Sequence, residues 1–284
     1  MKYIWKLLAV CGVTLASSYA ISAGLIDPKG TIALEQRALL FDAALIMLVV
    51  VVPVIIMSFV FAYRYRSTAR KGDYKPDWHH STLLECFWWG IPAIIVLILS
   101  IIVWGKTHEL DPYKEMAIKG EKEQIEVVAL SWKWLFIYPK ENIATVNELY
   151  LPAGKQVEFH ITADAPMSAF SIPQLAGQIY AMAGMRTRMH VYSNQIGNYD
   201  GLNTQVSGQG FADMHFTTHV VDANNFNEWV KKVRNSNKPL DVVAYKKLFK
   251  TDASHPIEYY ATVKPDLFSE IMMQYNNKTQ WLHP

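Results

Sequence analysis

Two apolar segments that contain no charged residue, at 43–63 and 86–105, set the strongest limit on how this chain can fold. Each has the length of about 20 residues that an α-helix needs to cross the hydrocarbon core of a bilayer. Pro53 and Pro92 lie within them, and membrane helices tolerate proline when neighbouring groups satisfy the carbonyl that it leaves free. We therefore predict a transmembrane hairpin whose two helices span about 39–63 and 83–105.

Charges around the hairpin indicate its orientation. The connection between the helices is rich in basic residues and has only Asp73 and Asp77 as acidic ones; the basic residues are Arg64, Arg66, Arg70, Lys71 and Lys75. Positively charged connections stay in the cytoplasm. Residues 1–20 have the basic start, short apolar core and small-residue end of a signal peptide. Both features place the N-terminus and everything after residue 105 outside the cytoplasm.

The cysteines limit the chemistry of the outer part. The chain of 284 residues has two, Cys11 and Cys86, and both lie in apolar segments before residue 105. The part after residue 105 therefore contains neither a disulfide nor a metal centre that needs thiolate ligands. A formal net charge of +2 gives no electrostatic basis for binding nucleic acid, and we predict no such partner.

Residues 121–221 have the pattern of an all-β domain. Residues 124–138 form an aromatic and β-branched strand with Trp132, Trp134 and Phe136 on one face, and 186–192 and 211–221 repeat the pattern. Short strands separated by Gly, Pro and Asn predict a β-sandwich with antiparallel or mixed pairing. The aromatic strand is either part of the sandwich core or a surface at which electrons enter.

The spacing of apolar residues changes after residue 221 to that of helices. Asp222 and Asp241 stand before apolar residues at helical spacing, as N-cap residues do, and Pro265 opens a third such segment. We predict a C-terminal helical extension over 222–284, whose short amphipathic helices cover either the sandwich or another protein.

No catalytic residue is predicted, because the chain has no nucleophile elbow, phosphate-binding glycine loop or convincing carboxylate pair. Nine histidines raise the question of a metal. His215 and His219 share one face of a strand, His190 on a neighbouring strand could join them, and thioether ligands for Cu(I) could come from Met182, Met185 and Met189. Exposed histidines and core methionines explain the same residues, and we predict no metal site. A membrane-tethered periplasmic copper-binding or electron-transfer protein stays as the alternative.

Several runs of sequence resemble subunit II of the cytochrome bo type ubiquinol oxidases, in the haem–copper oxidase superfamily. They are Trp-Lys-Trp-Leu-Phe-Ile-Tyr at 132–138, Ala-Thr-Val-Asn-Glu at 144–148, Ser-Ile-Pro-Gln-Leu at 171–175, Gly-Gln-Ile-Tyr-Ala-Met-Ala-Gly-Met at 177–185 and Val-Lys-Pro-Asp-Leu-Phe at 263–268. The resemblance extends from residue 25 to about residue 275. It implies a two-helix transmembrane hairpin, an all-β cupredoxin-like sandwich and short C-terminal helices.

The resemblance also gives a meaning to the loop between residues 197 and 214. In relatives that oxidise cytochrome c, a loop of this form holds two bridging cysteines, a glutamate, a histidine and a methionine that bind a dinuclear copper centre. The corresponding positions here are Asn203, Gln205, Ser207, Phe211 and Met214, and a further histidine of those relatives corresponds to Ser168. Only the methionine is kept. The resemblance therefore implies a copper site that has been vacated, and no electron transfer from cytochrome c.

As a whole, the resemblance implies a non-catalytic subunit II of a proton-pumping quinol:oxygen oxidoreductase, a terminal oxidase of aerobic respiration in the bacterial inner membrane. Haems and a copper ion are expected in the partner subunit I, ubiquinol is the expected substrate, and subunits III and IV are expected partners. Glu85, at the cytoplasmic start of the second helix, matches a carboxylate at the mouth of a proton channel in this family. The alternative is a helix-start carboxylate that the helix dipole favours.

Overall fold

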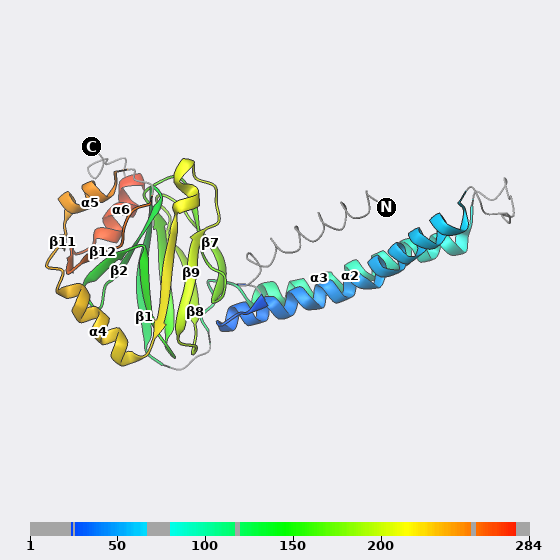
Figure 1. Ribbon diagram of the computed structural model, residues 1–284, viewed down its shortest axis with the longest axis horizontal. Coiled ribbons are helices and arrows are strands. Elements are labelled where there is room, and N and C mark those ends of the chain that lie inside the picture. Colours follow the sequence, from blue (N-terminus) through cyan, green and yellow to red (C-terminus); the bar gives the residue numbers. More distant parts are fainter. Residues whose placement is uncertain (1–23, 25, 67–79, 117–119, 251–253, 277–284) are drawn as a thin grey trace, which may run out of the picture. The chain divides into compact units, whose positions relative to one another are not determined.

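The computed structural model describes residues 24, 26–66, 80–116, 120–250 and 254–276. The chain divides into two compact units, one of residues 38–111 and one of residues 1–37 together with 112–284 (Figure 1). The signal peptide predicted at 1–20 lies outside the described residues.

The first unit consists of most of two long helices, α2 (Thr31–Arg64) and α3 (Thr82–Glu109). Among the described residues these two helices are long and apolar enough to cross a membrane. Both hydroxyls of their apolar stretches are satisfied within the helix, since Ser58 donates to the carbonyl of Val54 and Ser100 to that of Val96, each at 2.7 Å. Neither serine needs a partner in lipid.

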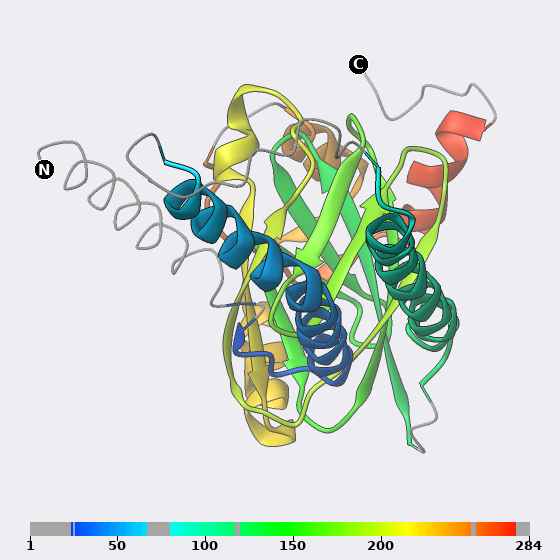
Figure 2. The ribbon, with the colours of Figure 1, turned by 90° about the vertical axis from the view of Figure 1, so that its right-hand side faces the viewer.

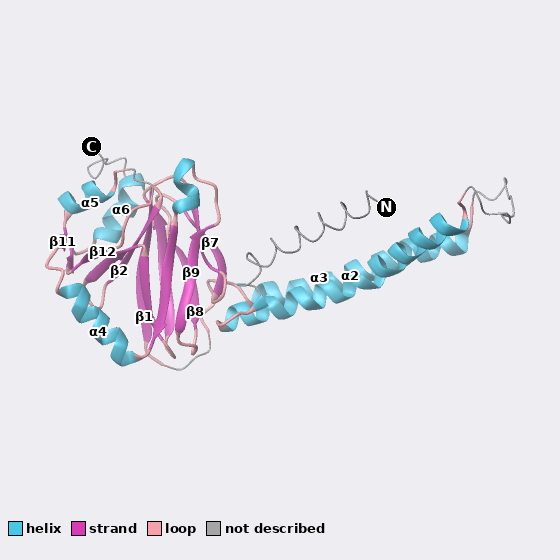
Figure 3. Ribbon diagram, in the orientation of Figure 1, coloured by secondary structure: helices cyan, strands magenta, loops and turns pink. Residues whose placement is uncertain are grey.

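The second unit contains a sandwich of two mixed sheets (Figures 2 and 3). The six-stranded sheet has the order β12 (Glu258–Tyr260), β3 (Ile143–Val146), β2 (Lys133–Tyr138), β1 (Lys122–Leu130), β5 (Gln156–Ala163) and β8 (Thr187–Tyr192). The five-stranded sheet has the order β4 (Glu148–Pro152), β10 (His215–Val221), β9 (Gly197–Asn203), β6 (Ser168–Ile172) and β7 (Ala176–Ala181). β1 pairs antiparallel with β2 and parallel with β5, and β10 is parallel to β4, so the pairing is mixed.

Two predicted strands differ from the structure. Residues 124–138 form two strands, β1 and β2, joined by a turn at Ser131 and Trp132, where Trp132 has the left-handed φ of 61°. The predicted strand 211–221 begins later, because a 3₁₀ helix, η1 (Gln209–Asp213), precedes β10. The first turn contains neither glycine nor proline, so nothing near Trp132 marks the chain reversal. The second does contain Gly210, after Gly208, and these glycines mark where the loop ends.

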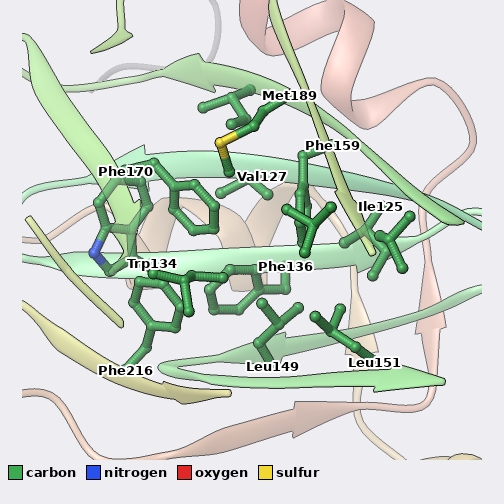
Figure 4. Packing of buried hydrophobic residues seen from close by; sticks show 14 of the residues in the cluster. Ile125, Val127, Trp134, Phe136, Leu149, Leu151, Phe159, Phe170, Met189 and Phe216 are labelled. Atoms are coloured by element: carbon green, nitrogen blue, oxygen red, sulfur yellow. The ribbon is translucent and has the colours of Figure 1, made fainter. Parts of the chain in front are cut away.

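The core between the sheets contains a cluster of aromatic rings (Figure 4). The rings of Phe170 and Phe216 stack at 5.2 Å with an interplanar angle of 5°, and Trp134 meets Phe170 edge-on at 5.3 Å. Gly201 leaves the room for Phe216, because a Cβ there would lie 2.1 Å from its ring. Trp134 and Phe136 are fully buried, so the aromatic strand belongs to the core. Each such side chain contributes about 1.5–3 kcal/mol by leaving water.

The C-terminal residues form a second core on the outer face of the six-stranded sheet. It contains α5 (Val242–Leu248) and α6 (Leu267–Asn276), with β12 and the short parallel pair β11 (Pro239–Leu240) and β13 (Thr262–Val263). The buried side chains of α4 (Ala223–Arg234) belong instead to the core cluster between the sheets. Val128 and Leu135 from the sheet pack in one cluster with Tyr245 and Phe268. Residues 222–276 are therefore not only helical, since β12 extends the sheet beside β3.

Both predicted N-caps of this region are confirmed. The carboxylate of Asp222 accepts hydrogen bonds from the backbone N–H groups of Asn224 and Asn225, both at 2.9 Å, at the start of α4. The carboxylate of Asp241 accepts from Ala244 N–H at 2.8 Å at the start of α5. Each carboxylate satisfies donors that a helix leaves unpaired in its first turn.

A buried carboxylate fastens the C-terminal helices to the sandwich. Asp164, directly after β5, is fully buried and accepts hydrogen bonds from Tyr245 Oη (2.5 Å), Gln274 Nε2 (2.7 Å) and Tyr275 Oη (2.6 Å). Burial, and then the charge of Asp164, raise the pKa of Tyr245 well above its ordinary value, so this hydroxyl stays protonated and donates. Neutral donors from α5 and α6 thus compensate one buried charge.

The segment before the first helix is fixed to the sandwich as well. The N–H groups of Lys29 and Gly30 both donate to the carbonyl of Gln174, at 2.7 and 2.9 Å, and Ser193 Oγ donates to the carbonyl of Lys29 at 3.1 Å. A Cβ on Gly30 would lie 2.0 Å from the carbonyl oxygen of Leu175, so the close approach requires glycine. We call residues 26–36 the N-terminal latch.

Candidate functional site

The loop between β9 and β10 is held together by one side chain. Asn203 is 3% exposed, and its side-chain oxygen accepts hydrogen bonds from the backbone N–H groups of Ala169 (2.8 Å) and Gln205 (3.1 Å). Because both groups are donors, the side-chain nitrogen must face the other way. It donates to Ser207 Oγ at 3.2 Å and to Met214 Sδ at 3.3 Å. All the hydrogen-bonding capacity of the amide is used within the loop and strand β6.

An indole ring closes the loop from the side of the β1–β2 turn. Trp132 Nε1 donates to the carbonyl of Ser207 at 3.2 Å. The ring lies against two glycines: a Cβ on Gly210 would be 2.3 Å from Trp132 Cδ2, and Gly208 has a φ of +110°. Both glycines are therefore required for this packing. The predicted continuous strand over 124–138 does not allow for this contact, because Trp132 lies in the turn between β1 and β2.

The structure brings three of the six copper-ligand positions into direct contact, namely Asn203, Ser207 and Met214. Ser168 is buried beside them, but its hydroxyl donates to the carbonyl of Pro166 at 3.3 Å. Gln205 contributes its backbone N–H group to the cluster.

Phe211, the remaining position, lies in η1, where its carbonyl accepts from Met214 N–H at 3.2 Å. The donor set at the six positions is therefore an amide pair, two hydroxyls, a phenyl ring and one thioether. Only the thioether is a soft copper ligand, and it already accepts a hydrogen bond from Asn203. These side chains do not fit a copper pair bridged by thiolates.

The histidines considered as metal ligands are not neighbours. His190 lies on β8 of the six-stranded sheet, whereas His215 and His219 lie on β10 of the other sheet, so the predicted neighbouring strand was wrong. His190 Nδ1 is 3.2 Å from Gln156 Nε2, and burial lowers the pKa of His190. His219 contacts Asn198 Oδ1 at 2.7 Å. Within the described ranges, no three His, Cys, Asp or Glu residues form a group that could hold a metal ion.

The methionines are equally dispersed. Met189 lies in the core between the sheets, whereas Met185 is largely exposed. Core packing explains the first, and neither observation favours a thioether site.

Glu85 lies in the first turn of α3, where its N–H donates to the carbonyl of the N-cap residue Ser81 at 3.0 Å. Its carboxylate is half exposed, and Oε2 is 3.5 Å from His80 Nε2. A carboxylate in a first helical turn is stabilised by the helix dipole. Both members of this pair are exposed to solvent.

Comparison with known proteins decides the family. Residues 22–104 match the family described as cytochrome c oxidase subunit II, transmembrane domain, and residues 234–279 match the COX aromatic rich motif. The cytochrome bo(3) ubiquinol oxidase subunit 2 of Pseudomonas aeruginosa is 42% identical over 253 residues, which cover 89% of this chain and 76% of that protein. The ubiquinol oxidase subunit 2 of Acetobacter aceti is 42% identical over 279 residues, 96% of this chain and 91% of that protein. The chain belongs to the quinol oxidase subunit II family.

A more distant member of the family is the quinol oxidase subunit 2 of Bacillus subtilis, 34% identical over 243 residues. A solved structure, the periplasmic domain of cytochrome oxidase subunit II from Bradyrhizobium japonicum, covers 43% of this chain and 99% of its own at 20% identity. Its TM-score of 0.40 is too low to add to the case.

This subunit II is therefore part of a membrane-anchored terminal oxidase, an oxidoreductase complex. The resemblance inferred from short runs of sequence is confirmed, and so is the predicted fold of two apolar helices, a β-sandwich and short C-terminal helices.

Proposed function

We propose that this subunit II carries no redox centre and that its complex receives electrons from ubiquinol rather than from cytochrome c. The observation that carries the proposal is the cluster of Asn203, Ser207 and Met214, whose hydrogen bonds occupy the positions at which relatives bind copper. The sequence supports it, since no cysteine follows residue 105. The printed names of the relatives also support it, because they are ubiquinol and quinol oxidases.

The role that remains is structural. The two helices pack on a partner subunit I that holds the haems and the copper ion, and the sandwich covers the periplasmic side of that subunit. The signal peptide predicted at 1–20 and the basic connection between the helices support this orientation, with the N-terminus and the outer domain in the periplasm of a bacterial inner membrane. Subunits III and IV complete the assembly. The dispersed histidines and methionines do not favour a free-standing copper-binding or electron-transfer protein.

Purification of the complex through this chain tests the proposal. We expect a haem-containing partner to co-purify with it. Met214→Leu removes the only copper-type ligand left in the loop. Because we propose that this loop binds no copper, the copper-to-haem ratio of the variant complex should equal that of wild type. A purified chain without haem, or a Met214→Leu complex that has lost copper, would contradict the proposal.

We propose further that Glu85 takes up protons at the cytoplasmic end of α3 for transfer into subunit I. Its exposure and the nearby imidazole of His80 support this role. Glu85→Ala should slow proton-coupled oxygen consumption while the complex still assembles. Glu109→Ala is the control, because Glu109 ends the same helix at the opposite side. Unchanged oxygen-consumption kinetics in the assembled Glu85→Ala complex would exclude the role.

A further inference from the structure

The edge strand β8 of the six-stranded sheet carries a buried histidine on its outer face. Met189 and Val191 belong to the core between the sheets, so His190 points to the opposite side. Arg188, its neighbour on that outer face, is exposed, whereas His190 is only 2% exposed. Chain from outside the sheet therefore covers the face at His190.

Part of this cover is the connection from α3 to β1, of which residues 113–116 lie over the sheet. The guanidinium carbon of Arg188 is 5.9 Å from the centre of the Tyr113 ring, within the range of a cation–π contact. Oε2 of Glu115 is 2.6 Å from Nζ of Lys122 on β1. Because β5 lies between β8 and β1, the chain crosses β5 between these two contacts. We call residues 113–116 the crossing segment.

The hydrogen bond that His190 makes under this cover suits a neutral ring. Nδ1 of His190 is 3.2 Å from Nε2 of Gln156, a side chain that is itself 3% exposed. An amide nitrogen only donates, so Nδ1 accepts and carries no proton. The amide oxygen of Gln156 is buried and has no hydrogen-bond partner in the described part of the chain. Turning the amide over would bring this oxygen to a protonated Nδ1, but a neutral amide does not compensate a buried charge as a carboxylate does.

Four charged groups act on His190 from the elements around it. They are Glu158 on β5, Glu115 in the crossing segment, Lys122 on β1 and Arg188 on β8 itself. Burial has the largest influence and lowers the pKa of His190 below its ordinary 6.5; the two carboxylates oppose this shift and the two cations add to it. A proton on His190 is therefore more stable when the crossing segment is away and water reaches the ring.

The two carboxylates near His190 stay ionised in mild acid. The hydrogen bond and the charge of Lys122 hold the pKa of Glu115 below its ordinary value. Burial would raise the pKa of Glu158, but the hydrogen bond from His160 Nε2, at 2.9 Å, helps to lower it overall. The Glu115–Lys122 contact of the crossing segment is therefore not itself the part that responds to mild acid.

We propose that His190 is a pH-sensitive clasp for the crossing segment. While the imidazole is neutral, the segment lies on the outer face of the sheet. In mild acid His190 takes up a proton, water enters and the segment leaves this face, which frees the direct connection from α3 to the sandwich. In the orientation proposed above, the clasp responds to the acidity of the periplasm. It depends on neither the copper positions nor Glu85, so it can fail without them.

Trypsin cleavage after Lys114, in the crossing segment, measures the opening in the purified full chain. The reference is His190→Asn, whose amide can take the place of Nδ1 but cannot gain a proton. This reference keeps His160, which lies on the same face of the sheet, and it meets the same protease at the same pH. The ratio of the wild-type cleavage rate to the reference rate therefore isolates the titration of His190.

We expect this ratio to rise severalfold, and at most about tenfold, when the pH is lowered from about 7.5 to about 5.5. The rise begins at the ordinary pKa of 6.5, because only below it does the open state bind a proton that the closed state lacks, and one proton allows a factor of ten per pH unit. Cleavage after Arg234, at the end of α4, is the control, and its ratio should be the same at both pH values.

Gln156→Glu separates the clasp from a general loosening in acid. Its carboxylate can accept from a protonated Nδ1 of His190 and compensates the charge where it is buried. The ratio of Gln156→Glu to His190→Asn should therefore stay constant between about pH 7.5 and 5.5. Two results overturn the proposal: a wild-type ratio that is the same at both pH values, or a Gln156→Glu chain that opens in acid as wild type does.

Discussion

Replacement of Asn203 by alanine should loosen the loop that relatives use to bind copper. The change removes both acceptor contacts, to the N–H groups of Ala169 and Gln205. A buried donor left without a partner costs about 1–3 kcal/mol. Ala169 is buried and Gln205 half buried, so about 2–4 kcal/mol is expected for the two groups together. The lost contacts to Ser207 and Met214 act in the same direction.

Hydrogen exchange on the assembled oxidase measures this cost where it arises. Because about 1.4 kcal/mol corresponds to a factor of ten, amides in residues 203–214 and the N–H of Ala169 should exchange about 30- to 700-fold faster in Asn203→Ala, provided that they exchange through local opening. Amides of the far strand β3 should not change.

Gln205→Ala is the matched control, because Gln205 joins the cluster through its backbone and not through its side chain. In Gln205→Ala, the free energy of local opening that these amides report should stay within about 0.5 kcal/mol of wild type, as for ordinary surface substitutions. Equal exchange in Asn203→Ala and Gln205→Ala would refute the reasoning, because it would show that the amide of Asn203 does not hold the loop.

Three further predictions concern the outer domain. Gly30→Ala places a Cβ 2.0 Å from the carbonyl oxygen of Leu175, so it should weaken the N-terminal latch by about 1–3 kcal/mol. The backbone N–H at position 30 should then exchange faster than in wild type, and unchanged protection would contradict this. Tyr245→Phe removes a hydrogen bond to the buried carboxylate of Asp164 and should destabilise the C-terminal helices by about 1.5–3 kcal/mol. The expected result is faster proteolysis after residue 240, and resistance equal to wild type would refute this prediction. Burial raises the pKa of Glu126 from its usual 4.5 to about 7. Between these pH values the folded state holds a proton that the unfolded state has lost, so the free energy of unfolding should fall as pH rises from about 4.5 to 7. Glu126→Gln should remove this part of the pH dependence of stability, and an unchanged pH dependence of denaturation would contradict the prediction.

Local features of this fold could be predicted from the sequence because they depend on neighbouring residues. The two spans follow from length and the absence of charge, although α2 starts at Thr31 rather than at 39, since its first turns belong to the outer unit. The caps at Asp222 and Asp241 were visible for the same reason, because an N-cap acts on residues two or three positions ahead.

Features that depend on distant residues could not be predicted. The contact of Gly30 with Leu175 joins segments 145 positions apart, and nothing near Gly30 signals it. The strand β12 is three residues long, too short for a period to show. At the candidate site, comparison with the family identified the positions, but the hydrogen bonds from Asn203 to Met214 and to Ala169 required the fold.

The most direct test of the account is the electron donor of the purified complex. Oxygen consumption should be fast with ubiquinol and absent with reduced cytochrome c as the only donor, because the loop of subunit II offers amide and hydroxyl groups where a copper pair needs thiolates. Sustained oxygen consumption with cytochrome c alone would contradict the account.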